Sequence, residues 1–178
     1  MPRSGKEFIF VTGGRRSGKS SYALGFGESL GKRRLYIATA RLLDLEMEER
    51  IARHRSERGL EWETVEEPVN IAKTISGSSL YDVIVIDCLT LWLCNLVHES
   101  GFGDKELFRE MDALADVCKD KETAIIAVSN ELGFGVIPDN PLSRRFSDLA
   151  GTMNQKMAKA ADRVVLTVSG VPVTIKGS

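Results

Sequence analysis

Five short apolar runs constrain the fold of this 178-residue chain more than any other feature. They are apolar at consecutive positions and rich in β-branched residues, a pattern typical of strands covered on both faces of a parallel sheet. The runs are FIFV (8–11), LYIA (35–38), VIVID (83–87), AIIAV (124–128) and VVLTV (164–168). Stretches with helical spacing alternate with them, at 19–31, 44–58, 68–76, 104–119 and 142–161, and another helix is expected from Leu89. The alternation predicts an α/β fold in which helices flank a mostly parallel sheet with right-handed crossovers.

The last apolar run is followed almost at once by another extended segment, VPVTIK (171–176). A connection this short cannot hold a crossover helix, so the final pair of strands is predicted to be an antiparallel hairpin at one edge. Pro172 agrees with that position, because proline lacks an N–H for the sheet. With 43% hydrophobic residues and no internal repeat or long linker, residues 1–178 are expected to form a single domain.

A glycine-rich segment, GGRRSGKS (13–20), lies between the first apolar run and the first helical stretch. It matches the pattern GxxxxGK[ST] in the required strand–loop–helix context. Glycines allow successive backbone N–H groups to surround a phosphate, and the helix that follows contributes its positive end. The segment therefore predicts a phosphate-binding loop, formed by Gly13, Gly14, Arg15, Arg16, Ser17, Gly18, Lys19 and Ser20.

Individual side chains of this loop have separate expected roles. Lys19 is predicted to reach the β- and γ-phosphate oxygens, and Ser20 to give its hydroxyl to Mg²⁺. Arg15 and Arg16 could contact phosphate or a neighbouring subunit, or could be ordinary solvated cations. Asp87, which ends the run VIVID, is the expected second acid of the metal site, although it could also cap the following helix.

Residues 44–58 have the charge distribution of a well-specified helix, with glutamates early, arginines late and Gly59 after the last turn. Met47, Ile51 and His54 share one face of that helix. His54 therefore points with the apolar stripe toward the sheet. The residues alone leave two interpretations open: a packed, hydrogen-bonded histidine at a helix end, or a nucleophile or acid–base group facing a nucleotide.

Three further sets of polar residues could have functional or purely structural roles. Asn130 and Glu131 follow the run AIIAV, at the sheet edge where α/β proteins bind ligands, so they could serve catalysis, acceptor binding or only a turn. Arg144 and Arg145 begin a helix, where they could contact phosphate or another subunit, or be solvated. His98 is expected near the end of the helix that follows Asp87, in a surface or capping role.

The composition excludes several classes of protein. The net charge is −1 without a basic arm, so no nucleic acid partner is expected. No apolar run could span a membrane and the first residues do not resemble a secretory signal, so a cytoplasmic location is expected. Cys88, Cys94 and Cys118 have no metal-binding spacing and are predicted to be buried, reduced thiols.

Several segments together resemble the bifunctional adenosylcobinamide kinase / adenosylcobinamide-phosphate guanylyltransferase family of cobalamin biosynthesis. The resemblance runs from about residue 8 to residue 176. Many enzymes share the phosphate loop, whereas VSNELGFGVIP and the segment around His54 are specific to this family. The segments are GGRRSGKS, YIATA, EMEERIARHRSERG, WETVEE, IDCLTLWLCNLV, VSNELGFGVIPDN, RRFSDLAGTMNQKMA and VVLTVSGVPVTIK.

The resemblance implies a RecA-like P-loop NTPase fold, usually a homotrimer, that catalyses two reactions. The γ-phosphate of ATP or GTP first goes to the aminopropanol hydroxyl of adenosylcobinamide. GTP then gives its GMP to adenosylcobinamide phosphate, forming adenosylcobinamide-GDP, through a histidine that carries GMP.

The family's histidine corresponds to His54. Family members often have a second histidine or another polar residue just before it, whereas this chain has Arg53, so a helper role at that position is in doubt. The remaining nucleotide contacts implied by the resemblance are Ala38, Thr39, Ala40, Arg55, Ser56, Glu57, Arg58, Glu66 and Asp87.

Two other functions compete with this one. The chain could be a different P-loop kinase of a small metabolite, in which His54 is structural. It could also be a RecA-like assembly module that binds nucleotide without transfer chemistry.

Overall fold

The computed structural model describes residues 7–41, 61–99, 101–120 and 122–177. These residues form a seven-stranded sheet in the order β3-β2-β4-β5-β1-β6-β7, in which β6 and β7 pair antiparallel and the other neighbours are parallel. The strands are β1 (Phe8–Gly13), β2 (Arg34–Ala38), β3 (Trp62–Glu66), β4 (Val83–Asp87), β5 (Ala124–Asn130), β6 (Arg163–Val168) and β7 (Val171–Lys176). The predicted parallel sheet and the C-terminal edge hairpin are confirmed.

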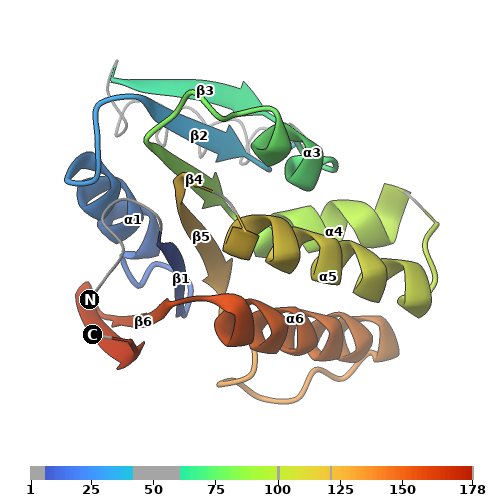
Figure 1. Cartoon of the computed structure of the whole chain (residues 1–178). Helices are drawn as coiled ribbons and strands as arrows, with labels where there is room; N and C mark the ends of the chain where they lie inside the picture. Colours follow the sequence, from blue (N-terminus) through green and yellow to red (C-terminus); the bar gives the residue numbers. More distant parts are fainter. Residues whose placement is uncertain (1–6, 42–60, 100, 121, 178) are drawn as a thin grey trace.

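Helices cover the sheet unequally (Figure 1). One of them, α1 (Lys19–Glu28), packs on the face opposite the other described helices, which lie together on the right in this view. That second group consists of α3 (Ile71–Ser76), α4 (Leu89–Glu99), α5 (Asp104–Asp120) and α6 (Pro141–Ala160). None of the helices in the described ranges is long and apolar enough to cross a membrane.

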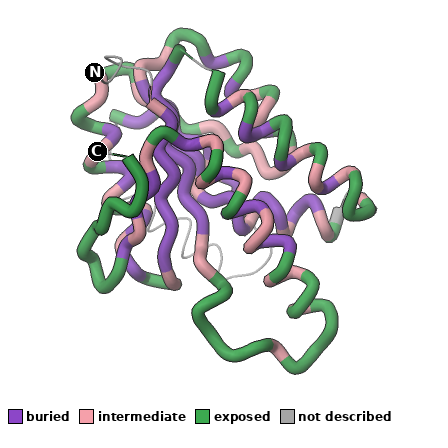
Figure 2. Tube along the Cα trace, turned by 60° about the horizontal axis from the view of Figure 1, so that its bottom comes forward, coloured by how far each residue is buried: buried purple, intermediate pink, exposed green. Residues whose placement is uncertain are grey.

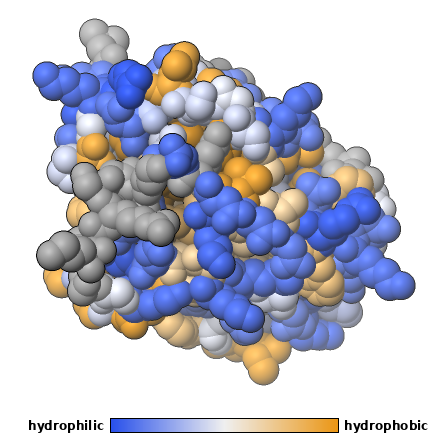
Figure 3. Space-filling model, viewed as in Figure 1, coloured by the Kyte–Doolittle hydropathy of each residue, from blue (hydrophilic) through white to orange (hydrophobic). Residues whose placement is uncertain are grey.

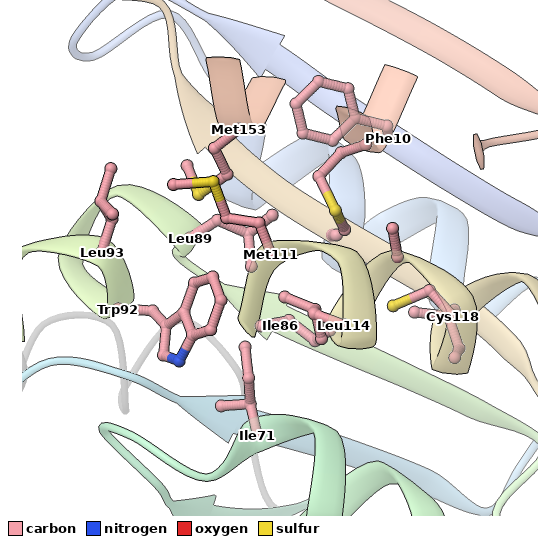
Figure 4. Close-up of a cluster of buried hydrophobic side chains, with 14 of the residues drawn as sticks. Phe10, Ile71, Ile86, Leu89, Trp92, Leu93, Met111, Leu114, Cys118 and Met153 are labelled. Atoms are coloured by element: carbon pink, nitrogen blue, oxygen red, sulfur yellow. The ribbon is translucent and has the colours of Figure 1, made fainter. Parts of the chain in front are cut away.

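The core is largest beneath the group of four helices. Side chains from α3, α4, α5 and α6 converge there on the sheet, with Trp92, Met111 and Met153 at the centre of the cluster (Figure 4). A smaller cluster lies under α1 and includes Val85 and Trp62. The strands at the middle of the sheet are buried except at the last residues of β4 and β5 (Figure 2), which explains why their sequences are apolar at consecutive positions.

The helix boundaries lie within three residues of the predicted ones, and several coincide with them. Helix α1 ends at Glu28 instead of residue 31, because the hydroxyl and the amide of Ser29 both bind the Phe26 carbonyl. Helix α3 begins at Ile71 instead of residue 68, because the Glu67 carboxylate accepts the amides of residues 69 and 70 in a turn. The helix predicted over 44–58 lies outside the described residues.

Strand β3 was not among the predicted strands. It is an edge strand, and of its five residues Trp62 alone is buried, whereas Glu63, Thr64 and Glu66 are exposed. A strand this polar has neither the continuous apolar run of a central strand nor a clean alternation. Its place beside β2 comes from pairing across the sheet, Arg34 with Trp62 through Ala38 with Glu66.

An ion pair fixes the corner where α1 connects to β2, at the end of the sheet where β4 begins. The Asp82 carboxylate accepts hydrogen bonds from the amides of Lys32 and Arg33, at 3.1 and 3.0 Å, and from the Arg33 guanidinium at 2.6 and 3.0 Å. These bonds, with the Arg33 guanidinium contributing most, lower the pKa of Asp82 to about 2.

We expect Asp82 to contribute an acid-dependent part of the stability. Its folded-state pKa lies below the ordinary value, so the contribution is present above about pH 4 and disappears as the pH falls toward 2. Urea unfolding of Asp82→Asn between pH 7 and pH 2.5 should show lower stability than the wild type at pH 7 and a smaller loss on acidification. Asp116→Asn, on the exposed side of α5, serves as the control. An unchanged acid dependence in Asp82→Asn would contradict this role.

Candidate functional site

The carboxyl ends of the parallel strands meet at one edge of the sheet, and most of the described predicted site residues lie there. Glu66, Ala38 and Asp87 occupy one row across β3, β2 and β4. Two strands farther along, Gly13 at the end of β1 is in register with Asn130 of β5. Ligands of open α/β sheets bind at this edge, so the register places the phosphate loop and the acidic residues on the same side of the molecule.

The phosphate loop begins where β1 has no room for a side chain. Gly13 has a φ of 154°, and a Cβ there would lie 2.4 Å from the Thr167 carbonyl oxygen. The Ser17 hydroxyl forms a 2.7 Å hydrogen bond with the Thr167 hydroxyl. From the turn between β6 and β7, the amide of Gly170 donates to the Ser17 carbonyl at 3.0 Å. The C-terminal hairpin therefore supports the loop directly.

Helix α1 follows the loop from Gly18, which is left-handed with a φ of 94°. Lys19 opens the helix, and 6% of its surface is exposed. Its ammonium donates to the Gly14 carbonyl at 2.6 Å, across the loop. Burial lowers the pKa of Lys19, while Cys88 and Asp87 nearby oppose that shift. The cation is thus held within the loop, on the side facing the acid of β4.

Asp87 ends β4 and is half-buried. Its carboxylate accepts a 2.9 Å hydrogen bond from the Tyr36 hydroxyl. Helix α4 begins at Leu89, so the residue in its N-cap position is Cys88. Asp87 therefore does not cap this helix, which was the alternative role considered from the sequence. Burial first, and then the charge of Asp87, raises the pKa of Cys88 to about 12, which keeps this thiol protonated. The charge of Asp87 also acts on Lys19, whose pKa it raises against the effect of burial.

Thr39 fixes the segment after β2 to the segment after β4. Its hydroxyl donates to the Cys88 carbonyl at 2.7 Å, and the hydroxyl oxygen of Thr39 accepts from the Cys88 amide at 2.8 Å. The Thr39 carbonyl in turn accepts from the buried amide of Asn95 on α4, at 2.9 Å, and Asn95 also binds the Pro68 carbonyl. Thr39 therefore positions this edge through its buried side chain.

A buried polar network holds the end of β5. The side-chain amide of Asn154, on α6, donates to the Asn130 carbonyl at 3.1 Å, and its oxygen accepts from Ser129 at 2.7 Å. The Thr90 hydroxyl accepts from the Asn130 amide at 2.8 Å. The Glu131 amide donates to the Gly13 carbonyl at 2.9 Å. These bonds fix the backbone of Asn130 and Glu131 beside the phosphate loop.

Ala40 lies half-buried just beyond Thr39, and Arg15 and Arg16 are exposed on the loop. His54 and the predicted contacts Arg55, Ser56, Glu57 and Arg58 lie outside the described residues.

Both arginines at the start of α6 bind within the chain. Arg144 donates to the carbonyls of Pro138 and Asp139, at 3.0 and 2.6 Å, and Arg145 pairs with Asp104 of α5 at 2.6 Å. Of the cysteines, Cys88 and Cys118 are buried as expected, whereas Cys94 is only half-buried and lines a cavity. His98 is exposed in the last turn of α4, as expected.

Sequence reasoning did not find the contacts that support the site from distant parts of the chain. Thr167 is 150 residues from Ser17, and Tyr36 is 51 residues from Asp87. A polar residue inside an otherwise apolar strand, such as Thr167 in VVLTV, is the signal that could have indicated the first of them.

A parallel sheet with a phosphate loop after β1 and an acid at the end of a nearby strand defines a P-loop nucleotide-binding protein with the RecA-like fold. Solved structures agree on the fold. An ATPase domain and the RadB recombinase each superpose with a TM-score of 0.50, at 11% and 16% sequence identity. Both alignments cover 92% of this chain, and they cover 70% and 74% of the respective structures.

The chain belongs to the cobinamide kinase / cobinamide phosphate guanyltransferase family, whose model matches residues 9–175. It is 42% identical over 168 residues to the bifunctional adenosylcobalamin biosynthesis protein CobP of Pseudomonas aeruginosa, an alignment that covers 94% of this chain and 96% of the relative. It is 38% identical to the bifunctional adenosylcobalamin biosynthesis protein CobU of Escherichia coli K12, with 94% and 99% covered. The family resemblance seen in the sequence is confirmed.

The two adjacent glycines of the loop give a matched test of its support. Gly13→Ala places a methyl group against the Thr167 carbonyl in a left-handed region, whereas a Cβ at Gly14 meets nothing within 4 Å. We expect Gly13→Ala to lower the free energy of unfolding by about 2 kcal/mol or more, and Gly14→Ala to change it by about 0.5 kcal/mol or less. Urea unfolding without nucleotide measures both. Equal stability of the two variants would show that the hairpin does not brace the loop.

Proposed function

We propose that this chain, as one domain over residues 1–178, phosphorylates adenosylcobinamide with ATP or GTP and then transfers GMP from GTP to the product. The second reaction would pass through a guanylyl-histidine at His54 and yield adenosylcobinamide-GDP. The observation that supports this best is the shared sheet edge, where a phosphate loop and Asp87 lie together in a member of the cobinamide kinase / cobinamide phosphate guanyltransferase family.

The phosphate loop would hold the triphosphate of either nucleotide. Its backbone amides and the positive end of α1 face the phosphates, and Lys19 neutralises the charge that develops on the leaving group. This requires the Lys19 ammonium to exchange its bond to the Gly14 carbonyl for phosphate oxygens. The nucleotide contacts proposed beyond the loop are Ala38, Thr39, Ala40, Arg55, Ser56, Glu57, Arg58, Glu66 and Asp87.

Ser20 and Asp87 would hold Mg²⁺. A hydroxyl and a carboxylate are the oxygen donors that this cation prefers, and two protein ligands suffice when phosphate and water complete its shell. Both side chains are half-buried, Ser20 in the first turn of α1 and Asp87 at the end of β4, where the Tyr36 hydroxyl holds its carboxylate. When bound, the cation would offset negative charge on the phosphates.

The kinase step is a displacement at the γ-phosphorus. The aminopropanol hydroxyl of adenosylcobinamide forms the new P–O bond and gives up its proton to water. The bond between the γ-phosphorus and the bridging oxygen breaks, and the nucleoside diphosphate leaves with the electron pair. Because the loop amides and Lys19 would surround that bridging region, the protein's part would be positioning and charge stabilisation.

Guanylyl transfer needs two displacements at the α-phosphorus. The His54 imidazole forms a P–N bond while pyrophosphate leaves, and a phosphate oxygen of adenosylcobinamide phosphate then displaces the histidine. Splitting the transfer in this way lets the bulky acceptor bind after pyrophosphate has gone. The homotrimer and the cytoplasmic location expected from the sequence belong to the same proposal.

Removing the histidine should separate the two activities. We expect His54→Ala to abolish the label that [α-³²P]GTP leaves on the protein, which is acid-labile and base-stable, while phosphorylation of adenosylcobinamide continues within about threefold of wild type. The chain has two histidines, so His98→Ala, labelled with GTP in the absence of acceptor, is the control and should keep the label. A label that persists in His54→Ala would contradict the proposed intermediate.

Asp87 should affect both reactions through the metal. We expect Asp87→Asn to raise the Mg²⁺ concentration that gives half-maximal rate and to lower both rates by about a hundredfold. Tyr36→Phe removes the 2.9 Å hydrogen bond but leaves the carboxylate, so its Mg²⁺ dependence should stay near that of wild type. Titration of each variant with Mg²⁺ in the two assays measures this. A wild-type Mg²⁺ dependence in Asp87→Asn would show that Asp87 does not bind the metal.

A further inference from the structure

A cavity of about 390 Å³ lies between α4 and α6. Its walls come from the second half of α4, the first half of α6 and the segment 131–140 that connects β5 to α6, called here the 131–140 loop. The apolar side chains that line it are Val97, Leu132, Pro138, Leu142, Phe146 and Leu149. A mostly apolar cavity of this size is typical of sites for small organic molecules.

The 131–140 loop carries apolar side chains that the core does not use. Val136 is 95% exposed, Phe134 78% and Ile137 76%, and Leu142 at the start of α6 is 58% exposed. The loop projects from the body of the protein as an exposed segment (Figure 2), and the lower edge of the molecule, where it lies, shows hydrophobic atoms among hydrophilic ones (Figure 3). Neighbouring apolar side chains exposed in this way mark a binding surface.

Hydrogen bonds hold both ends of this loop. At its start the Glu131 amide binds the Gly13 carbonyl, and the Glu131 carboxylate accepts the amide of Gly133 at 3.0 Å. At its end Arg144 binds the carbonyls of Pro138 and Asp139, and the Asn140 side chain caps α6. The apolar side chains are therefore presented on a segment that is fixed beside the cavity.

Short stretches of chain connect the cavity to the end of β5, which lies beside the phosphate loop. Leu132, in its wall, comes two residues after Asn130, which is in register with Gly13. On α6, Leu149 is five residues from Asn154, which binds the Asn130 carbonyl, so about 8 Å of helix separates the cavity wall from the end of β5. A molecule in the cavity could extend a short arm to the phosphates.

The charges around the cavity do not suit a second nucleotide. Arg145 lines it but is paired with Asp104, and Arg144 is occupied by two loop carbonyls. A triphosphate needs cations or backbone amides that are available to it. The other polar side chains that line it are Cys94, His98, Ser143 and Ser147. One imidazole and two hydroxyls suit neutral amides better than a triphosphate.

We propose that this cavity and the exposed apolar side chains of the 131–140 loop bind the corrin ring of the cobinamide acceptor, an inference that rests on the proposed function. The ring is an apolar macrocycle fringed with neutral amides and is larger than the cavity, so one edge enters it while Phe134, Val136 and Ile137 cover the part outside. The aminopropanol arm runs past Asn130 and Glu131 toward the phosphate loop. The same site then serves both reactions, because the acceptor differs between them only at the end of that arm.

Two exposed side chains test this without disturbing the core. We expect the double variant Val136→Asn, Leu142→Asn to weaken binding of adenosylcobinamide, followed by its absorption spectrum at equilibrium, by about tenfold or more. The KM for adenosylcobinamide should rise by a similar factor. The affinity for nucleotide, the thermal stability and the oligomeric state by light scattering should stay at wild-type values. Leu80→Asn, which is 73% exposed at the opposite end of the sheet, is the matched control and should change none of them.

Unchanged adenosylcobinamide affinity in the double variant, or an equal loss in Leu80→Asn, would overturn the proposal. So would a change in oligomeric state with normal affinity, because the surface would then be a contact between copies of the chain. Wild-type protein that binds adenosylcobinamide through these residues but does not phosphorylate it would support the site and contradict the proposed function.

Discussion

The absence of a side chain at Gly13 is the constraint on which the rest of the site depends. At this residue β1 ends against β6, where the Thr167 carbonyl would lie 2.4 Å from any Cβ, and the Gly13 carbonyl accepts the Glu131 amide beyond β5. Both neighbours of β1 therefore contact the start of the phosphate loop. The order β5-β1-β6 thus places a neighbouring strand on each side of the start of the loop.

From this point the carboxyl edge divides into two parts. One part lies at the ends of β4, β2 and β3 and is proposed for nucleotide and metal. It contains the row Asp87, Ala38 and Glu66, together with the buried Thr39. The other part is proposed for the acceptor. It consists of the 131–140 loop, which follows β5 along the chain, and the cavity between α4 and α6. The Asn154 network at the end of β5 lies between the two, which gives that buried asparagine a function in positioning as well as in packing.

The sequence predicted the central sheet well because burial on both faces leaves a continuous apolar run, as in VIVID, and the phosphate loop because its backbone requires glycines at fixed spacing. It could not supply the strand order, nor β3, whose exposed Glu63 and Thr64 carry no apolar signal. The bond between Ser17 and Thr167 joins residues 150 positions apart, and it follows from strand pairing that no local pattern encodes. The intramolecular partners of Arg144 and Arg145 likewise depend on how the 131–140 loop and α5 pack against α6.

The central claim is that a triphosphate bound at this edge presents its α-phosphorus to the imidazole of His54. A crystal structure of the complex with Mg²⁺ and a non-hydrolysable GTP analogue tests it directly. We predict that the β- and γ-phosphates lie in the loop 13–20, with a His54 nitrogen, from the same chain or a neighbouring copy, facing the α-phosphorus at about 3–3.5 Å. An imidazole on the opposite side of the molecule from the phosphates would contradict the account.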